Sequence, residues 1–411
     1  MRIIVQKFGG TSVASSEMRQ HAVARVISAL NSGYTPVVVV SAMGKLGQPY
    51  ATDSLLELLR NVNPNASRRN TDLLLSCGEI ISAVVFAEEL QAAGHPAQAL
   101  TGWQCGILTD ENFSQARIQE INPQRIHSLL EEGIIPVVAG FQGVSRSQEV
   151  TTLGRGGSDT TAAALGVVLQ AEWVGIYTDV DGIKTADPRL VPDAPTLPAV
   201  SGREVVELAH LGARVIHPRA AELALEEGIP IRILSTTDDG PGTWIANRVS
   251  PISGKGGELV GDRVVIGIAH MTGRVQVTIT GEGDLNRADV APKIFDMLAQ
   301  HGVSVDQIFL SAALIAFTID ESDVSLAREL LTTLGLHVRI EEGFAKVSVV
   351  GAGMHGVPGV MARVVNCLER ANISIYQTTD SHANISCLVK EEQIAQAVQA
   401  LHREFNLDRS V

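Results

Sequence analysis

Two glycine-rich segments place charged side chains where a bound anion would suit them. The first is QKFGGTSV, residues 6–13, which follows the apolar run Ile3-Ile4-Val5 and precedes a helical pattern. Glycines at a strand-to-helix turn let backbone N–H groups approach a phosphate, and Lys7 can meet its oxygens. The spacing differs from that of the GxxxxGK[ST] phosphate loop. On the residues alone, phosphate binding and an ordinary turn with a surface lysine both remain open.

The second segment is TTLGRGGSDTTAAALG, residues 151–166, which again reads as strand, glycine loop and helix. Ser158 or Asp159 could simply cap a helix that starts at Thr160. A capping turn does not need Arg155, however, and a guanidinium grips a carboxylate or phosphate with two hydrogen bonds. Two such loops on one sheet suggest one for the phosphates of a nucleotide and one for an acidic acceptor, with Lys7 between developing negative charges.

A third cluster is IYTDVDGIKTADPR, residues 176–189, which leaves a strand at Thr178-Asp179 and passes through a turn-rich loop to Arg189. Loops at the carboxyl ends of parallel strands are the usual place for ligand contacts. Asp-Gly and Asp-Pro are also ordinary turn formers. A ligand loop and a plain turn are therefore equally compatible with this cluster.

Gly351, Gly353 and Gly356 form a GxGxxG pattern after an apolar run, which is the fingerprint of a dinucleotide-binding turn. The chain ends at Val411, which leaves too little sequence after Gly356 for a nucleotide-binding sheet. The segment also belongs to an internal repeat with a constant offset, in which Val277, Ile279 and Gly281 correspond to Val347, Val349 and Gly351. The dinucleotide interpretation is therefore set aside.

Hydrophobic patterning predicts an α/β protein with three parts. Residues 1–246 alternate unbroken Val/Ile runs with helical stretches, which predicts a mainly parallel sheet sandwiched by helices. Residues 247–263 read as a linker, because Pro, Gly, Ser and charge cluster there. Residues 264–341 and 342–411 each read as βαββα, which a final strand would complete as a ferredoxin-like βαββαβ module.

Composition narrows the function classes. The 411 residues carry a formal net charge of −13, which argues against nucleic acid or an anionic membrane as partner. The N-terminus lacks a signal-peptide core and no run is long enough to span a bilayer, so we expect a cytoplasmic protein. The four cysteines are widely spaced, which predicts reduced core residues, with a catalytic nucleophile as the weaker alternative.

Four motifs together resemble the aspartate kinases of the amino-acid kinase superfamily, and the likeness runs over essentially the whole chain. They are KFGGTSV at 7–13, GRGGSDTTA at 154–162, TDVDG with TADPR at 178–189, and GARVIHPRA at 212–220. The resemblance implies transfer of the γ-phosphoryl of ATP to the side-chain carboxylate of L-aspartate, the first step toward lysine, threonine, methionine and diaminopimelate. The repeated modules resemble paired ACT domains.

The resemblance also implies roles for individual residues. Lys7 would neutralise the transferring phosphate and Asp159 would orient it, while Arg155 would hold the α-carboxylate of aspartate and Glu79 its ammonium. Further substrate contacts would come from Thr52, Gly156, Gly157 and Ser158. The nucleotide would contact Gly9, Gly10, Ser12, Ser41, Thr178, Asp179, Gly182, Arg189, Arg214 and Val215. Magnesium would be held mainly by ATP oxygens and water, with no protein ligand.

Three departures from the family pattern bear on these roles. Arg214 stands where many members have lysine, Lys184 stands where a tyrosine is common, and the loop before Thr52 is longer than its compact form. His217, beside Pro218, is expected to be structural.

Regulation and assembly are expected to depend on the two modules. The chain most resembles the diaminopimelate-sensitive aspartokinase I isoform in the length of the loop before Thr52 and in the segments VGAGMHGVPGV and DSHANISCLV. The segment VDQIFLSAALIAF also lacks the Gln-Asn pair usual in lysine- and threonine-regulated relatives. A small amino-acid inhibitor, with meso-diaminopimelate favoured, is expected at the modules. The candidate effector residues are Gly281, Gly283, Asp306, Gly351, Gly353 and Gln377. Exposed sheet edges make a homodimer through the modules the default.

Two other functions remain as alternatives. Another kinase of the superfamily, acting on glutamate or an acylated amino acid, would use the same phosphate chemistry. An amino-acid-sensing regulator with a dead kinase half would be expected to have lost Lys7, Arg155 or Asp159, and all three are present.

Overall fold

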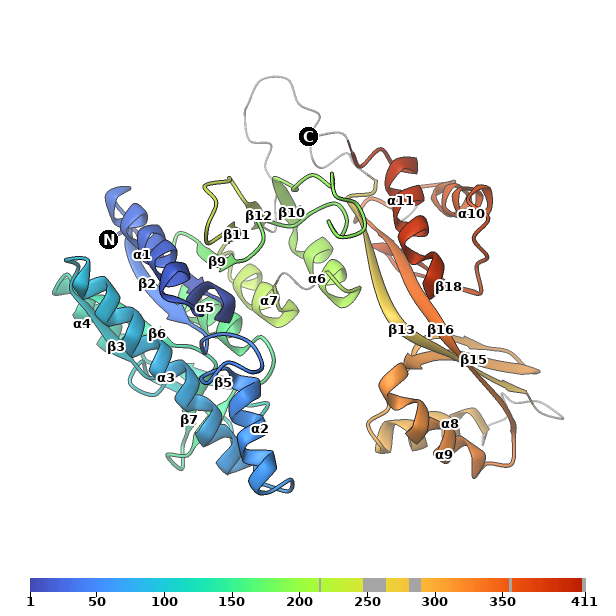
Figure 1. The fold of residues 1–411 in the computed structure, drawn as a ribbon, viewed down its shortest axis with the longest axis horizontal. Coiled ribbons are helices and arrows are strands. Elements are labelled where there is room, and N and C mark those ends of the chain that lie inside the picture. The colour runs from blue at the N-terminus through green and yellow to red at the C-terminus, as the bar shows by residue number, and fades with distance from the viewer. Residues whose placement is uncertain (214–215, 247–263, 281–289, 355–356, 409–411) are drawn as a thin grey trace. The chain divides into compact units, whose positions relative to one another are not determined.

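The computed structural model describes residues 1–213, 216–246, 264–280, 290–354 and 357–408. These divide into two compact units. The first contains residues 1–183, 196–209 and the described part of 214–255, and the second contains residues 184–195, 210–213 and the described residues from 264 onward. Each unit is described by itself, and Figure 1 shows the elements of both. The expected linker, residues 247–263, lies outside the described residues.

The first unit is built on an eight-stranded sheet with the order β10-β12-β11-β9-β1-β2-β6-β3. All neighbouring strands are parallel except β11 and β12. The strands are β1 (Ile3–Phe8), β2 (Thr35–Val40), β3 (Ala97–Leu100), β6 (Ile135–Ala139), β9 (Val174–Thr178), β10 (Ala199–Ser201), β11 (Ile231–Ser235) and β12 (Thr243–Ala246). The predicted mainly parallel sheet is therefore confirmed.

Helices cover both faces of this sheet, as the unalternated apolar runs predicted. The helices are α1 (Ser16–Asn31), α2 (Thr52–Val62), α3 (Arg68–Ala92), α4 (Gln124–Glu131), α5 (Gly157–Val168), α6 (Gly202–His210) and α7 (Pro218–Glu226), with a short 3-10 turn η1 (Gly10–Val13). Residues of α1 and α3 pack on Ile4 and Phe8 of β1. Helix α5 contacts β1, β2 and β9 and also packs on α7. A side chain on β1 therefore faces either α1 and α3 or α5, in alternation.

A smaller sheet completes the first unit, with the order β5-β4-β7-β8. Its strands are β4 (Ile107–Thr109), β5 (Ile118–Ile121), β7 (Gln142–Ser145) and β8 (Val150–Thr152). Helix α3 packs against β8. Strand β8 leads directly into the second glycine-rich segment, so this sheet helps to fix where Arg155 lies.

The second unit has one six-stranded sheet with the order β14-β15-β13-β16-β18-β17. Its elements are β13 (Gly267–Thr280), α8 (Val290–Gln300), β14 (Asp306–Leu310), β15 (Leu314–Asp320), η3 (Glu321–Asp323), α9 (Val324–Thr332), β16 (His337–Val350), α10 (Val360–Arg370), β17 (Gln377–Asp380), β18 (Asn384–Lys390), η4 (Glu391–Gln393) and α11 (Ile394–Glu404). The spacing between the first residues of helices α8 and α10 equals the spacing between the first residues of strands β15 and β18. This spacing is also that of the sequence repeat. The sequence repeat is therefore a structural repeat.

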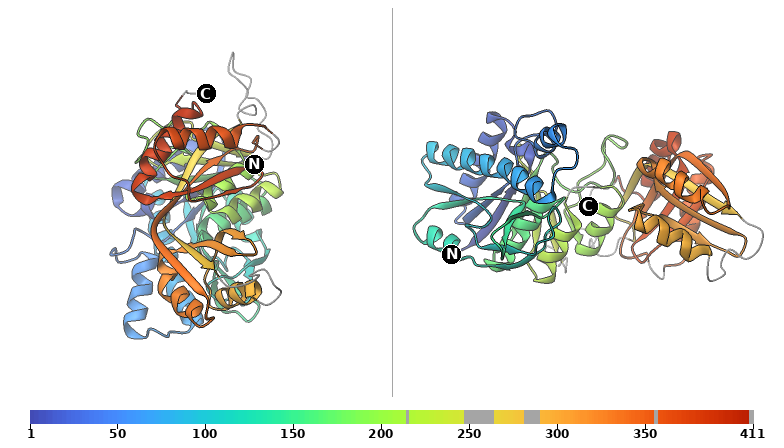
Figure 2. Two further views of the ribbon diagram at one scale, coloured as in Figure 1. Left: turned by 90° about the vertical axis from the view of Figure 1, so that its right-hand side faces the viewer. Right: turned by 90° about the horizontal axis from the view of Figure 1, so that it is seen from below.

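The second module is completed in a way that the sequence did not indicate. Its final strand does not follow α11; it comes from the start of β13, where Gly267–Met271 pairs antiparallel with Lys346–Val350. The end of β13 and the start of β16 belong to the first module, so both long strands run through the two modules (Figure 1). Figure 2 shows this pair of strands from two further directions.

Residues 184–195, which sequence patterning assigned to the kinase part, pack on the second module. Ala186 and Ala194 join its apolar core. The Thr185 hydroxyl lies 2.9 Å from Nε2 of the buried His402, and the Ile268 amide donates to the Thr185 carbonyl over 2.7 Å. This part of the TDVDG–TADPR segment therefore belongs to the second unit.

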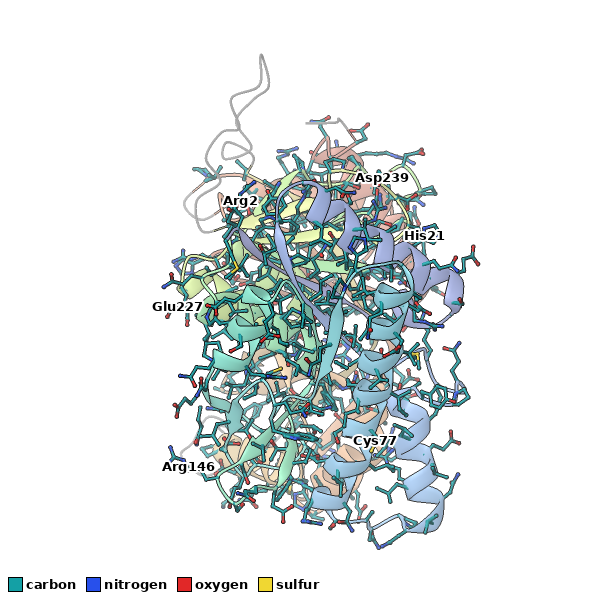
Figure 3. The ribbon with its side chains drawn as sticks, turned by 90° about the vertical axis from the view of Figure 1, so that its left-hand side faces the viewer. Arg2, His21, Cys77, Arg146, Glu227 and Asp239 are labelled. Atoms are coloured by element: carbon teal, nitrogen blue, oxygen red, sulfur yellow. The ribbon has the colours of Figure 1, made fainter. Side chains whose placement is uncertain are left out.

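The cysteine prediction is confirmed only in part. Cys105, Cys367 and Cys387 are buried and free, as expected of reduced core residues. Cys77 is exposed on α3, so its assignment to a core was wrong (Figure 3). The run LLLSCG has apolar residues all around the helix, but one side of α3 faces solvent, and Cys77 lies on that side.

No helix of the described residues is both long and apolar enough to cross a membrane.

Candidate active site

Lys7 and Asp159 form an ion pair at one end of the eight-stranded sheet. Lys7 is the next-to-last residue of β1 and its side chain faces α5, where Asp159 lies in the first turn. Nζ of Lys7 is 2.7 Å from Oδ1 of Asp159, and each side chain is 12% exposed. The other oxygen of Asp159 accepts a 3.3 Å hydrogen bond from the backbone amide of His217. The ammonium is therefore oriented, yet it remains accessible to a ligand.

The loop after β1 packs its backbone tightly against strand β9 and the loop that follows β2. A Cβ on Gly10 would lie 2.8 Å from the carbonyl oxygen of Ala42, and the Gly44 amide donates to the Gly10 carbonyl over 3.0 Å. The Gly9 amide donates to the Tyr177 carbonyl over 3.2 Å, so it is already in use. Among the described residues, the Gly10 and Thr11 amides at the start of η1 have no acceptor. These two amides can serve an anion.

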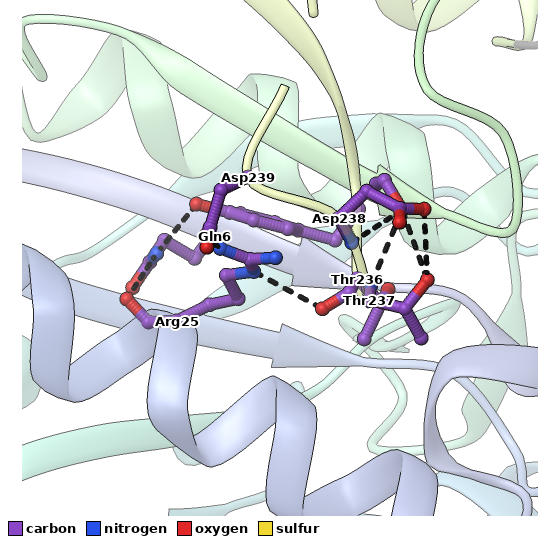
Figure 4. Close-up of polar contacts among 8 residues, drawn as sticks. Gln6, Arg25, Thr236, Thr237, Asp238 and Asp239 are labelled. Carbon is purple, nitrogen blue, oxygen red and sulfur yellow. Dashed lines mark hydrogen bonds and ion pairs between the residues drawn. The ribbon is translucent and has the colours of Figure 1, made fainter. Parts of the chain in front are cut away.

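Ser12 is held from behind by the segment that follows β11. The Thr236 hydroxyl donates to Oγ of Ser12 over 2.7 Å, and the Thr236 amide donates to the Thr178 carbonyl over 3.0 Å. Nε of Arg25 on α1 donates to the Thr236 carbonyl over 3.0 Å, and the same guanidinium pairs with Asp239 (Figure 4). The first glycine loop is thus held in place at Ser12 by Thr236, and Thr236 is in turn held by Arg25 of α1.

Arg155 lies at the tip of the second glycine loop, between two glycines with left-handed backbone. Gly154 has φ +76° and Gly156 has φ +68°, a region in which L side chains are strained. A Cβ on Gly156 would lie 2.2 Å from the His217 ring, and a Cβ on Gly154 would lie 2.9 Å from the Ser114 carbonyl oxygen. Close packing on both sides therefore holds the exposed Arg155 in place.

The capping interpretation of this segment was wrong. Helix α5 begins at Gly157, three residues before the expected start, and its N-cap is Gly156. Ser158 and Asp159 lie inside the first turn, and no side chain caps the helix. The left-handed glycine turn was the signal that sequence reasoning missed. Asp159 is instead free to pair with Lys7.

A cleft of about 550 Å³ joins these features. It brings together most of the residues predicted to act on the phosphate and the substrate: Lys7, Ser41, Thr52, Glu79, Arg155, Gly156, Gly157, Ser158 and Asp159. Further lining residues were not predicted: Asp53, Leu56, Leu75, Ser114, Phe141, Thr152 and Gly154. Ser114 and Phe141 have positive φ, at +71° and +72°, which their sequence context does not reveal. The cleft is the size of a small-molecule site.

Glu79 is the most unusual ionisable group in the cleft. Its side chain is 2% exposed, and Oε1 accepts a 3.1 Å hydrogen bond from the Ala42 amide. Oε2 has no hydrogen-bond partner among the described residues. Burial raises the pKa of Glu79 to about 8, and the Ala42 hydrogen bond offsets only part of this rise. A cationic group bound in the cleft would satisfy the second oxygen.

The residues predicted for the rest of the nucleotide site fall into three groups. Thr178 and Asp179 lie at the end of β9, next to the first glycine loop, and Gly182 has φ +141° with Thr243 packed against it. Arg189 belongs to the second unit, where it pairs with Asp187 over 2.6 Å. Arg214 and Val215 lie outside the described residues.

The candidate effector residues do not form one cluster. Asp306 of β14 pairs with Lys346, and Gln377 of β17 donates to the carbonyl of Gln307, so the ends of the two modules meet here. Gly351 lies elsewhere, directly after β16, where a Cβ would be 2.2 Å from the Val264 carbonyl oxygen, which gives this glycine a packing role. Gly353 is exposed. Gly281 and Gly283 lie outside the described residues.

Among the described residues, no group of three His, Cys, Asp or Glu side chains is placed to hold a metal ion.

Comparison with known families shows what this architecture is. Residues 2–235 match the amino acid kinase family and residues 339–403 match the ACT domain. Aspartokinase 1 of Bacillus subtilis is 44% identical over 409 residues, covering 100% of both chains. The aspartokinase of Geobacillus stearothermophilus is 43% identical over 413 residues, covering 99% of this chain and 98% of the relative.

Solved structures agree with these relatives. Escherichia coli aspartokinase III in complex with aspartate and ADP, in the R-state, has a TM-score of 0.76 and 29% identity, and the match covers 98% of this chain and 99% of that one. The same enzyme with lysine and aspartate, in the T-state, has a TM-score of 0.78. The chain therefore belongs to the aspartokinases, the members of the amino acid kinase family that act on aspartate.

Proposed function

We propose that this enzyme transfers the γ-phosphoryl group of ATP to the β-carboxylate of L-aspartate and forms 4-phospho-L-aspartate. The observation that carries the proposal is the Lys7–Asp159 ion pair of 2.7 Å, set between the amides of η1 and a cleft that holds Arg155 and Glu79. One side of Lys7 offers phosphate donors and the other offers groups for an amino acid. A phosphoryl group in transit between the two would lie beside the ammonium.

The cleft has the charges that a free amino acid requires. Arg155 is proposed to hold the α-carboxylate, because a guanidinium forms two charged hydrogen bonds with it. Glu79 is proposed to pair with the α-ammonium through its unpartnered Oε2. Thr52 and Ser158 would contact the side chain to be phosphorylated. Asp159 orients Lys7 and need not act as a strong base, since the substrate carboxylate is already ionised at neutral pH.

The nucleotide is proposed to bind at the carboxyl ends of β1, β2 and β9. Gly10 and Thr11 would donate backbone hydrogen bonds to its phosphates, with Gly9 and Ser12 shaping the loop and Ser41 nearby. Thr178, Asp179 and Gly182 would line the nucleoside side. Roles for Arg189, Arg214 and Val215 follow from the family motif alone. Mg²⁺ would arrive with ATP and keep phosphate and water ligands.

Feedback inhibition by a small amino acid is proposed to act where β14 meets β17. Gln307 lies in this region with 3% of its surface exposed, and neither of its amide atoms has a hydrogen-bond partner among the described residues. An amino-acid ligand could supply those partners, with Asp306 and Gln377 beside it. We favour meso-diaminopimelate over lysine or threonine, on the sequence grounds given above. The reaction would then begin the pathway whose products inhibit it.

A homodimer through the ACT modules is also proposed. Ile308, Phe309 and Leu310 on the edge strand β14 are 47%, 50% and 46% exposed. Three consecutive exposed apolar residues on a sheet edge favour pairing with a second copy.

The acceptor can be tested by trapping the acyl phosphate with hydroxylamine. Purified enzyme with ATP should form a hydroxamate from L-aspartate and far less from L-glutamate or N-acetyl-L-glutamate. A preference for glutamate or for the acylated acid would replace the aspartate assignment. Failure with every acceptor would favour the regulator without kinase activity.

A further inference from the structure

Asp72 is a fully buried carboxylate that the proposed chemistry does not use. It lies on α3 and is 0% exposed. Its carboxylate accepts four hydrogen bonds, and they come from only two residues. Oδ2 accepts from the amides of Ser114 and Thr152 over 2.8 and 2.7 Å, and Oδ1 accepts from their hydroxyls over 3.0 Å each.

The two donors belong to different segments of the chain. Thr152 is the last residue of β8, and Ser114 lies in the loop between β4 and β5. The Ala116 amide donates to the Thr152 carbonyl over 2.9 Å, so the segments run side by side. Ser114 has φ +71°, an uncommon conformation for a residue other than glycine, which must be held by its surroundings. Two hydrogen bonds to Asp72 provide that hold.

Both segments form the wall of the cleft beside Arg155. Ser114 and Thr152 line it, as do Leu75 and Glu79 of α3. Asp72, Leu75 and Glu79 are spaced i, i+3 and i+7, which places them along one face of the helix. The Ser114 carbonyl packs against Gly154, which directly precedes Arg155, and Thr152 lies shortly before Arg155 in the chain. A shift of either segment would therefore move the guanidinium.

We propose that Asp72 is a positioning residue for the amino-acid substrate. It fixes Ser114 and Thr152 relative to α3, and thereby sets the distance between Arg155 and Glu79, the two groups that clamp aspartate. This inference rests on the proposed role of the cleft as the aspartate site. Asp72 acts through its neighbours and does not touch the substrate. Burying a carboxylate is unfavourable unless its hydrogen bonds are satisfied, and here four donors satisfy it.

Two substitutions of Asp72 separate geometry from charge. Asp72→Ala leaves two buried amides without an acceptor, so the wall should relax. Asp72→Asn removes the charge and keeps the hydrogen-bonding geometry. The new side-chain carbonyl can accept from both amides, and the new NH2 group can donate to both hydroxyls, which rotate to accept. We expect Asp72→Ala to raise KM for aspartate about tenfold or more and KM for ATP less than about twofold. Asp72→Asn should recover most of the affinity.

A pair of adjacent threonines keeps the test decisive if Asp72→Ala does not fold. Thr152→Val removes a hydroxyl that bonds to Asp72, and Thr152→Ser restores it. Thr151→Val removes a buried hydroxyl of the same strand that bonds to Thr109 and does not line the cleft. We expect Thr152→Val to raise KM for aspartate, Thr152→Ser to reverse the rise, and Thr151→Val to lower only the thermal midpoint.

The inference would be overturned if Asp72→Ala changed both Michaelis constants alike, or if Thr151→Val matched Thr152→Val in KM for aspartate. Equal losses in Asp72→Asn and Asp72→Ala would also overturn it, since charge and not position would then matter. Arg155→Ala, measured in parallel, tests the cleft assignment itself. If Arg155→Ala leaves KM for aspartate unchanged, the proposed aspartate site fails. If it raises KM while the Asp72 variants do not, only the positioning role fails.

Discussion

Oδ1 of Asp159 lies 2.7 Å from Nζ of Lys7, and the two residues come from a strand and a helix that stand far apart in the sequence. The loop that follows β8 leads into α5, and α5 packs on β1, β2 and β9 of the eight-stranded sheet. Alternation along β1 turns Lys7 toward α5, and the glycine turn at 154–156 starts α5 early enough to present Asp159. We propose that the pair holds the ammonium where it can stabilise a transferring phosphoryl group.

Arg155→Ala should impair aspartate binding selectively. The lost charged hydrogen bonds are worth about 1.5–3 kcal/mol, which corresponds to a rise in KM for aspartate of roughly 10- to 150-fold. KM for ATP should stay within about twofold. Steady-state kinetics with each substrate varied in turn measures both. Equal losses for both substrates would argue against a carboxylate clamp at Arg155.

Glu79 should make aspartate binding depend on pH. Because burial raises its pKa to about 8, the empty site holds a protonated Glu79 at neutral pH, and this proton must leave before the carboxylate can pair with an ammonium. KM for aspartate should therefore fall as the pH rises from about 6.5 to 8.5, by up to about tenfold per unit below the pKa. The matched variant Glu79→Gln should have a higher KM and no such pH dependence. A pH profile shared by both enzymes would assign the titration to another group.

The same shift has a defined sign for stability. The pKa of Glu79 in the folded protein lies above its ordinary value of 4.5, so the folded state holds this proton more tightly than the unfolded state does. Its contribution to the free energy of unfolding is therefore largest at low pH and declines as the pH rises between the two values. The free energy of unfolding can be measured by denaturant titration at several pH values across this window. It should fall more steeply with rising pH in the wild type than in Glu79→Gln.

Thr236→Val should weaken ATP binding, because it removes a hydrogen bond that holds the first glycine loop at Ser12. The Thr236 hydroxyl donates to the buried Ser12, and loss of one such hydrogen bond costs about 0.5–1.5 kcal/mol, or roughly 2- to 12-fold in KM for ATP. KM for aspartate should change less. Thr237→Val is the matched control, since the exposed Thr237 hydroxyl bonds to its near neighbours Ser235 and Asp238 and not to the loop. If the two variants raise KM for ATP equally, Thr236 has no special link to the loop.

Gln307→Leu should separate stability from inhibition. Replacing a buried amide that lacks partners with an apolar side chain should raise the free energy of unfolding by about 1 kcal/mol. It should also weaken inhibition by the effector, measured by titrating activity with meso-diaminopimelate, lysine and threonine singly and in pairs. Uninhibited turnover should persist. Unchanged inhibition in this variant would place the effector away from Gln307.

Local patterns predicted the parts of this molecule that are continuous in sequence. The Val/Ile runs indicated the parallel sheet because strands buried on both faces need no alternation. The constant offset of the internal repeat predicted the two modules. The family resemblance assigned one site to Lys7, Arg155 and Glu79. Hydrophobic patterning alone does not show that these distant residues meet.

Long-range pairing explains what was missed. Gly267–Met271 at the start of β13 supplies the last strand of the second module. Both halves of β13 carry apolar residues, so the sequence does not show which half belongs to which module. Asp72 and Ser114 are 42 residues apart and neither lies in a recognisable motif. Ser114 and Phe141 have left-handed backbone, and their amides donate to Asp72 and Thr161, which are distant in the sequence. Residues 184–195 looked like part of the kinase fold because their packing partners, such as His402, lie near the other end of the chain.

The proposed role of Lys7 is tested most directly by the hydroxamate assay with Lys7→Ala, in the presence of ATP, magnesium and saturating aspartate. We predict that acyl phosphate formation falls by about 10²- to 10³-fold, the range seen when a group that stabilises transition-state charge is removed. Circular dichroism and the thermal midpoint should show a folded protein. Turnover near the wild-type rate in folded Lys7→Ala would show that Lys7 does not stabilise the transferring phosphoryl group.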